Sequence, residues 1–179
     1  MRIISGSLKG RRFSPPKSFS ARPTTDIARE SLFNVLNNRI DFDDLSVLDL
    51  FGGTGSISYE FASRGCEAIT TVELNFKHFS YIKSMVKEFK LENAIGVIKA
   101  DVFKFIKKCS FKYDLVFADP PFDLKDFETI PARFFENSLL KEDGVFILEH
   151  SDKMSFEDHP NFNEVKKYGK VHFSFFTDK

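Results

Sequence analysis

The sequence predicts an α/β fold in which a mostly parallel, seven-stranded sheet carries helices on both faces. Three observations support this prediction. Short apolar segments alternate with segments of helical periodicity between residues 46 and 150, which is typical of βαβ units with right-handed crossovers. A glycine-rich turn, Gly52–Gly55, follows the first apolar segment. Two β-like segments joined across Gly169-Lys170 end the sequence and should form an antiparallel hairpin.

The length and composition of the chain limit the classes of protein to which it can belong. A chain of 179 residues is long enough for one domain with a sizeable core. Lysine plus arginine and aspartate plus glutamate both number 26, so a nucleic-acid-binding surface would have to be local. Cys66 and Cys109 match neither a disulfide framework nor a metal motif, and no apolar run resembles a membrane span or a signal peptide. We therefore expect a reduced, cytoplasmic protein that binds no membrane and no metal.

Residues 1–25 differ in composition from the remainder, so we divide the chain into a basic N-terminal arm (1–25) and one domain (26–179). Short β-like pieces flank Gly6 and Gly10 and indicate a hairpin. A projecting basic hairpin could contact nucleic-acid phosphates, although a solvated terminus would have the same composition. The cations assigned to this contact are Lys9, Arg11, Arg12 and Arg22.

Helices are marked by residues that favour helix ends. Thr24-Thr25-Asp26 offers N-cap chemistry, and Asn37-Asn38 can close the same helix. Gly65 fits the C′ position of a second helix, and Pro131 fits the first turn of the last one. Beyond the helix that begins at Asp26, we expect helices over about ten residues ending at Arg64, over Phe76–Phe89, over Val102–Lys108 and from Pro131 to about Asn137.

Strands are marked by apolar runs bounded by turn residues. The clearest run, Tyr113–Ala118, leads directly into Asp119-Pro120-Pro121-Phe122. The other strands are expected over Ser46–Phe51, Ala68–Val72, Ala94–Ala100, Gly144–Leu148, Val165–Tyr168 and Val171–Phe176.

The Asp119–Phe122 turn is the strongest candidate for a substrate site. Neither proline can offer an amide N–H, so the carbonyls of Asp119 and Pro120 should face outward with few competing donors. They form a cluster of acceptors with the Asp119 carboxylate, and Phe122 supplies a flat apolar face. A planar ligand that carries an –NH₂ group would fit this turn. A rigid strand-to-helix connection is the alternative interpretation of two adjacent prolines.

The glycine turn and Glu73 together suggest a nucleotide site. Glycines permit a tight turn and a close approach of the backbone to a ligand. The full G-x-G-x-x-G pattern is not met, because Ser58 occupies the third position. Glu73 ends the next strand 20 positions after Gly53, a spacing at which an acid reaches ribose hydroxyls. An ordinary acid at a strand end remains the alternative for Glu73.

Four consecutive strands carry an acid at or near the carboxyl edge, namely Asp49, Glu73, Asp101 and Asp119. Ligands of open α/β sheets bind along this edge. Four carboxylates suit a pyrophosphate poorly and a cationic nucleoside better. S-adenosylmethionine, which carries a sulfonium and an amino group, is such a ligand. Asp49 could instead be a satisfied carboxylate of the core.

Several segments resemble a known family. Val47–Gly55 resembles motif I of class I methyltransferases, and Asp119–Phe122 resembles motif IV of enzymes that methylate exocyclic amines. The arm with Arg22–Asp26, Leu32-Phe33-Asn34 and Lys167–Phe173 is similar to the RsmD-type bacterial 16S rRNA (guanine-N2) methyltransferases. The resemblance covers essentially the whole chain and implies a Rossmann-like class I methyltransferase fold with an N-terminal β-hairpin arm.

The resemblance also implies a role for each site residue. Glu73 would bind the ribose hydroxyls and Asp101 the adenine amino group of S-adenosylmethionine. Asp119 and Pro120 would accept the hydrogens of the target amine and direct its lone pair at the methyl group, with Phe122 stacked on the base. The implied cofactor residues are Asp49, Phe51, Gly52, Gly53, Gly55, Glu73, Leu74, Asp101 and Val102.

The implied partner is 16S rRNA, within the small ribosomal subunit or its assembly intermediate, bound by a monomeric enzyme. Three alternatives remain open. An amine methyltransferase acting on adenine N6 or on a protein glutamine would use the same turn. A nicotinamide-dependent oxidoreductase would use the glycine turn and Glu73 but not a proline-framed acceptor turn. A non-catalytic RNA-binding assembly factor could retain the fold. His150, near the expected pocket, could also contact the substrate.

Overall fold

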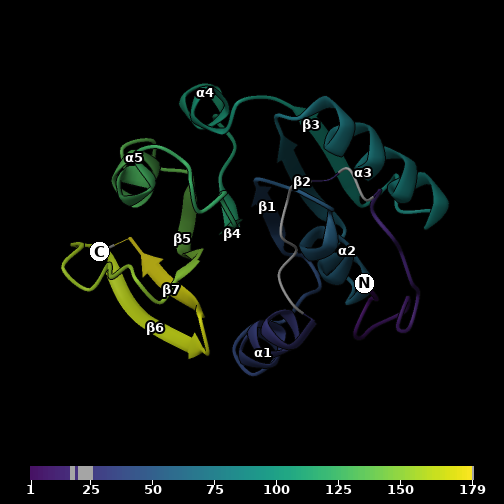
Figure 1. Ribbon diagram of the computed structural model, residues 1–179, viewed down its shortest axis with the longest axis horizontal. Helices are drawn as coiled ribbons and strands as arrows, with labels where there is room; N and C mark the ends of the chain where they lie inside the picture. The colour runs from purple at the N-terminus through teal and green to yellow at the C-terminus, as the bar shows by residue number, and fades with distance from the viewer. Residues whose placement is uncertain (17–18, 20–25, 179) are drawn as a thin grey trace.

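The computed structural model describes residues 1–16, 19 and 26–178. This part of the chain forms a seven-stranded sheet in the order β3-β2-β1-β4-β5-β7-β6 (Figure 1). Strands β1 to β5 pair in parallel, whereas β7 is antiparallel to both β5 and β6. The prediction of a mostly parallel sheet ending in an antiparallel hairpin is confirmed. The strands are β1 (Ser46–Leu50), β2 (Ala68–Glu73), β3 (Ile95–Lys99), β4 (Tyr113–Ala118), β5 (Leu140–Ser151), β6 (Phe162–Tyr168) and β7 (Val171–Thr177).

Helices cover both faces of this sheet, as predicted. Figure 1 shows α1, α2 and α3 on one side and α4 and α5 on the other. A short 3₁₀ helix, η1 (Phe127–Thr129), precedes α5. The helices are α1 (Asp26–Asn37), α2 (Ser56–Ser63), α3 (Phe76–Glu88), α4 (Val102–Lys108) and α5 (Ile130–Phe135).

The central strands are apolar on both faces because helices bury both. Successive side chains of a strand point to opposite faces. On β4, Leu115 and Phe117 belong to the core beneath α1, α2 and α3, whereas Val116 and Ala118 belong to the core beneath α4 and α5. Phenylalanine fills much of both cores, which confirms that most of its abundance reflects packing.

Several predicted elements have different bounds in the structure. Most differ by one residue at an end, whereas β5, β6 and α5 differ more, and β6 begins at Phe162 instead of Val165. Strand β5 extends to 12 residues from the predicted Gly144–Leu148, and its irregular start places Asp143 at a φ of 59°. This start is polar because it lies at the exposed amino edge, where Lys141 Nζ pairs with Asp114 at 2.8 Å. Helix α5 begins at Ile130 instead of Pro131 and ends at Phe135. The predicted N-cap at Thr24-Thr25 lies outside the described residues.

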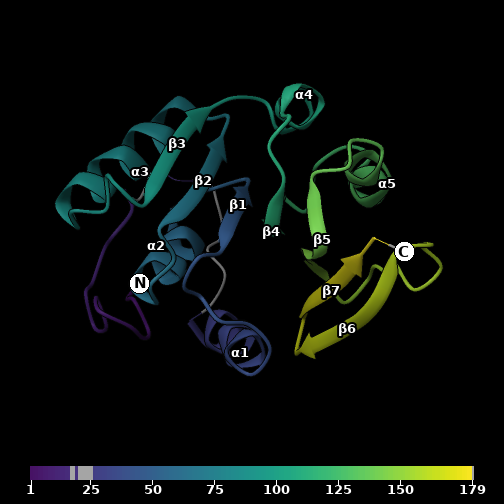
Figure 2. The ribbon, with the colours of Figure 1, turned by 180° about the vertical axis from the view of Figure 1, so that it is seen from behind.

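The start of the N-terminal arm forms the predicted hairpin, through an antiparallel bridge between Arg2 and Arg12. Ile3 N donates to the Arg11 carbonyl at 2.9 Å. The hairpin does not project freely, because Ile3 and Phe13 are buried in the core with α1, α2 and α3. Figure 2, the view from behind, shows this N-terminal segment beside α2.

Candidate active site

The carboxyl edge of the sheet brings the predicted site residues together. Leu50 of β1 is in register with Val72 of β2 and with Ala118 of β4. The next residue along each of these strands is Phe51, Glu73 or Asp119. Because neighbouring strands lie about 4.8 Å apart, these three positions follow one another across the edge. The glycine turn, the ribose-binding candidate and the acceptor turn therefore share one site.

The glycine turn is tight and closely packed. Gly52 N donates to the Val72 carbonyl at 2.9 Å, and Gly55 N donates to the Gly52 carbonyl at 2.7 Å. A Cβ on Gly52 would lie 2.5 Å from Thr71 Cγ2, so a larger residue does not fit. Phe51 has a φ of 62°, and Gly53 and Gly55 also have positive φ values. This backbone can approach a ligand without interfering side chains.

Glu73 is held in a defined orientation by backbone donors. Its Oε2 accepts Gly53 N at 2.8 Å, and its Oε1 accepts Asn75 N at 2.6 Å. His78 Nδ1 lies 4.0 Å from Oε1. A carboxylate has about four acceptor sites, so two such bonds leave capacity for the hydroxyls of a ribose. The hydrogen bond from Gly53 N to Glu73 thus connects the two residues that lie 20 positions apart in the sequence.

Asp49 is a buried carboxyl group whose pKa is raised by its surroundings. Ser58 Oγ donates to Asp49 Oδ2 at 2.5 Å and lies 2.7 Å from Thr71 Oγ1. The pKa of Asp49 is raised to about 7, chiefly by burial and also by the nearby charges of Asp119 and Glu73, while the hydrogen bonds from Ser58 lower it. Ser58, which replaces the third glycine of the G-x-G-x-x-G pattern, thus hydrogen-bonds to Asp49 of β1. Asp49 is satisfied in the core and also adjoins the site.

Asp101 stands at the start of α4 and caps it. Its Oδ1 accepts Lys104 N at 2.9 Å, which fixes the carboxylate at the edge of the sheet. Val102 is buried directly after it. Leu74 is 59% exposed, so its side chain is available to pack against a ligand.

The Asp119–Phe122 turn leads from the end of β4 into a hydrogen-bonded turn. The Pro121 carbonyl accepts Leu124 N at 2.9 Å, which closes a turn immediately after the acceptor pair. Pro120 is buried, whereas Phe122 is 46% exposed. The Phe122 ring contacts Phe127 edge-on, with centroids 6.5 Å apart, and so retains an open face. Asp119 is partly buried and close enough to raise the pKa of Asp49.

The predicted RNA-binding cations do not lie on this edge. Lys9, Arg11 and Arg12 are exposed on the N-terminal hairpin. The Arg11 guanidinium lies 5.9 Å from the centroid of the Phe89 ring. Arg22 is outside the described residues.

His150 is less available than its position suggested. Its Nδ1 lies 2.9 Å from the Ser151 carbonyl and its Nε2 lies 2.8 Å from Ser174 Oγ, so both nitrogens are occupied. Burial lowers its pKa. Sequence reasoning gave no role to Glu149, a buried residue that follows Leu148, the register partner of Ala118. Register therefore sets Glu149 beside Asp119, which only the strand pairing reveals.

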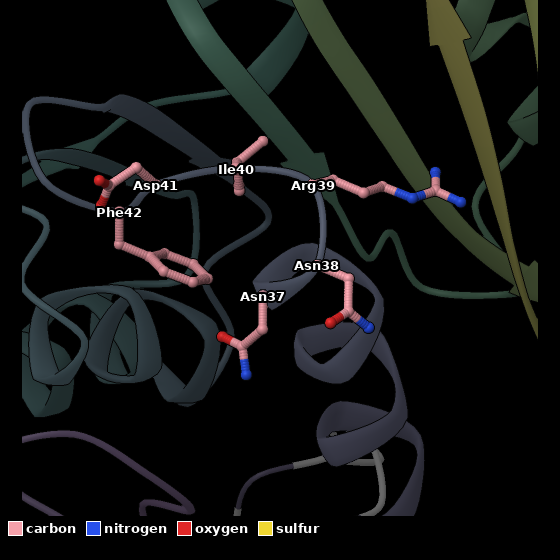
Figure 3. Close-up of a pocket in the computed structure, with 6 residues that line it drawn as sticks. All are labelled: Asn37, Asn38, Arg39, Ile40, Asp41 and Phe42. Carbon is pink, nitrogen blue, oxygen red and sulfur yellow. The ribbon is translucent and has the colours of Figure 1, made fainter.

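A separate hollow lies at the opposite end of the sheet. It has a volume of about 500 Å³ and is lined by Asn37–Phe42, between the end of α1 and the amino end of β1 (Figure 3). Figure 3 shows Arg39 extending away from it toward the C-terminal strands, where it pairs with Glu164. This hollow contains none of the predicted site residues.

Within the described residues, no three histidine, cysteine or acidic side chains come together in a way that could hold a metal ion. No helix in the same part of the chain is long and apolar enough to cross a membrane.

Comparisons with known proteins agree with this arrangement. A family model described as "Conserved hypothetical protein 95" matches residues 1–177, which include both the arm and the carboxyl edge. Over 161 residues the chain is 32% identical to "Putative rRNA methyltransferase YlbH" of Bacillus subtilis, covering 88% of this chain and 86% of that protein. Over 182 residues it is 29% identical to "Ribosomal RNA small subunit methyltransferase D" of Buchnera aphidicola, covering 99% and 92% respectively.

A solved structure confirms the fold. "Putative methyltransferase yhhF from Escherichia coli" superposes with a TM-score of 0.85 at 26% identity. The alignment covers 98% of this chain and 96% of that one. The class I methyltransferase fold predicted from the sequence is therefore confirmed.

Proposed function

The chain belongs to the RsmD-type family that the conserved hypothetical protein 95 model describes, and we propose that it methylates the N2 amine of a guanine in 16S rRNA. S-adenosylmethionine is the methyl donor. The observation that carries the proposal is the placement of the Asp119–Phe122 acceptor turn beside the glycine turn and Glu73. This puts a site for a planar amine next to a site for a nucleoside.

The residues at the edge fit S-adenosylmethionine. A Cβ on Gly53 would meet only the Phe51 carbonyl, at 3.6 Å, so the backbone there is open to close approach by a ligand, and Glu73 is already oriented by Gly53 N. Carboxylates at Asp49, Glu73 and Asp101 favour a ligand with a sulfonium and an ammonium group. The bound cofactor supplies an electrophilic methyl group. In this proposal, Asp49, Phe51 and the glycines border its methionine part, Glu73 binds the ribose, and Asp101, Leu74 and Val102 surround the adenine.

The acceptor turn orients the nucleophile. The Asp119 carboxylate and the Pro120 carbonyl accept the two hydrogens of the guanine amine, which directs the nitrogen lone pair at the methyl carbon. The same acceptors would stabilise the positive charge that grows on nitrogen as the methyl group is transferred and the sulfur leaves as a neutral thioether. The Asp119 carboxylate or solvent would then take the proton that the methylated amine must lose. Phe122 stacks on the base through its open face, a contact worth about 1–3 kcal/mol. Holding both reactants in line supplies further acceleration.

The N-terminal arm supplies contacts to RNA. Lys9, Arg11 and Arg12 are exposed on one hairpin, where they can neutralise phosphates. Arg22 completes this proposed set. The target base must leave any stack that it occupies, or already lie in a loop, before it can reach Asp119. We assign the substrate to the small ribosomal subunit or its assembly intermediate and the enzyme to the cytoplasm as a monomer.

Ligand titration tests the class of reaction. Calorimetry should detect binding of S-adenosylmethionine and no binding of NAD. Incubation of the protein with small ribosomal subunits that lack the modification should then transfer labelled methyl groups to RNA. Binding of NAD without binding of S-adenosylmethionine would contradict the proposal and favour an oxidoreductase. Methyl transfer to protein instead of RNA would also contradict it.

A further inference from the structure

One attachment of the arm to α2 runs through a buried serine, Ser63. Ser7 N donates to the Ser63 carbonyl at 2.6 Å, and Leu8 N donates to Ser63 Oγ at 2.9 Å. Ser63 Oγ in turn donates to the Ser5 carbonyl at 2.5 Å. Ser63 is only 2% exposed. Ser7 Oγ also donates to the Ser63 carbonyl at 3.3 Å, so four hydrogen bonds connect this one residue of α2 to the turn of the arm hairpin.

Gly6 permits this close contact. It has a φ of 81°, and a Cβ at this position would overlap the Ser63 carbonyl and lie 2.7 Å from Ser63 Oγ. Gly10, in the same hairpin, has nearly the same φ of 82°, but a Cβ added there would meet nothing within 4 Å. The two glycines share their backbone conformation. Only Gly6 is also required by the contact between arm and helix.

A buried ion cluster forms a second attachment. Glu60 of α2 accepts Ile4 N of the arm, and Arg29 Nη2 of α1 donates to the Arg2 carbonyl at 2.6 Å. Arg29 and Glu60 are both fully buried, and Arg29 Nε lies 3.7 Å from Glu60 Oε1. Buried charges that lose a partner are costly. The arm cannot leave α2 without depriving both side chains of hydrogen bonds.

Helix α2 links this attachment to the cofactor site. Gly55, the last glycine of the turn, is the N-cap of α2, and Tyr59 N donates to its carbonyl at 3.0 Å. All eight residues of α2 are buried. Eight helical residues span about 12 Å, so the arm turn that contacts Ser63 lies about one length of α2 from the glycine turn.

We propose that the docked arm fixes the position of bound RNA relative to Asp119, and thereby selects the nucleotide that is methylated. This inference rests on the proposed function, in which the arm binds RNA. A loosely tethered arm would increase RNA affinity without selecting a nucleotide. A docked arm instead holds the bound phosphates at a fixed distance from Asp119, so that only one nucleotide can reach the site. Gly6, Ser63 and Glu60 are positioning residues, and the cations remain the groups that touch RNA.

A matched pair of glycine variants tests this proposal. Gly6→Ala and Gly10→Ala impose the same backbone strain, but only Gly6→Ala disrupts the contact with Ser63. With saturating small subunits, the single-turnover methylation rate of Gly6→Ala should fall about tenfold to a hundredfold, because small misplacements of reactants are costly. Its affinity for RNA should change little, since the cations remain. Gly10→Ala should retain the wild-type rate, and both variants should bind S-adenosylmethionine normally.

Equal rates for the two variants would overturn the proposal, as would a loss in Gly6→Ala that saturating RNA restores. If Gly6→Ala does not fold, as judged by thermal unfolding, Ser63→Ala takes its place and should show the same separation of rate from affinity. A wild-type protein that methylates no rRNA would refute the proposed function. If the wild type is active and Gly6→Ala and Gly10→Ala have equal methylation rates, only the positioning role of the arm is refuted.

Discussion

At the scale of the residue, the proposed function assigns the chemical step to Asp119. Replacing its carboxylate by an amide in Asp119→Asn removes one acceptor for the target amine. We expect the single-turnover rate to fall about 10²–10³-fold, because preorganised groups that stabilise transition-state charge contribute effects of this size. Affinity for S-adenosylmethionine should fall little. Asp123→Asn, a change at an exposed acid four residues along, is the matched control. Unchanged turnover in Asp119→Asn would contradict the assignment.

Asp49 gives a prediction about pH. Its pKa is raised by burial from 3.8 to about 7, so between these values the folded protein binds more protons than the unfolded chain. Stability must therefore fall as the pH rises through this window. Chemical denaturation at a series of pH values should show this decline in the wild type and a weaker one in Asp49→Asn. Equal slopes for the two proteins would contradict the raised pKa.

At the scale of the element, the arm hairpin should control RNA affinity through its charges. Arg11→Glu with Arg12→Glu removes two proposed phosphate contacts, so the slope of log affinity against log salt should decrease in magnitude by about 1.4–1.8. Binding of S-adenosylmethionine should be unaffected. Lys108→Glu with Lys112→Glu, a pair of exposed cations outside the arm, serves as the control. Identical salt slopes for the arm variant and the wild type would remove the arm from the RNA interface.

The elements also show what the sequence reveals and what it does not. Periodicity correctly predicted β4 and α4 residue for residue, since each has a clear apolar period between strong end signals. It underestimated β5, whose polar start lies at an exposed edge. The carboxyl-edge residues of the site were predictable, because parallel strands bring their ends together.

Contacts between distant segments could not be predicted in this way. Docking of the arm depends on Gly6 meeting Ser63, and nothing in the local pattern of either residue indicates the other. Ser58 stands at the third position of the glycine motif, and its hydrogen bond to Asp49 becomes evident only when α2 is placed against β1. The place of Glu149 beside Asp119 follows from register, which a single sequence does not encode.

At the scale of the whole molecule, cofactor binding should stabilise the fold. The site draws on β1, β2, β4 and α4, so it exists only when the sheet is assembled. S-adenosylmethionine at about 100 times its dissociation constant should therefore raise the free energy of unfolding by about 2.7 kcal/mol. Thermal or chemical unfolding with and without the ligand measures this gain, and NAD provides the control. A gain with NAD and none with S-adenosylmethionine would contradict the cofactor assignment.

The product of the reaction tests the proposed function most directly. Small ribosomal subunits that lack the modification can be incubated with the protein and S-adenosylmethionine, and the methylated nucleosides of their RNA mapped by mass spectrometry. We predict N2-methylguanosine at a single position of 16S rRNA, absent when Asp119→Asn replaces the wild type. N6-methyladenosine, or RNA without any new methyl group, would contradict methylation of guanine N2 by this protein.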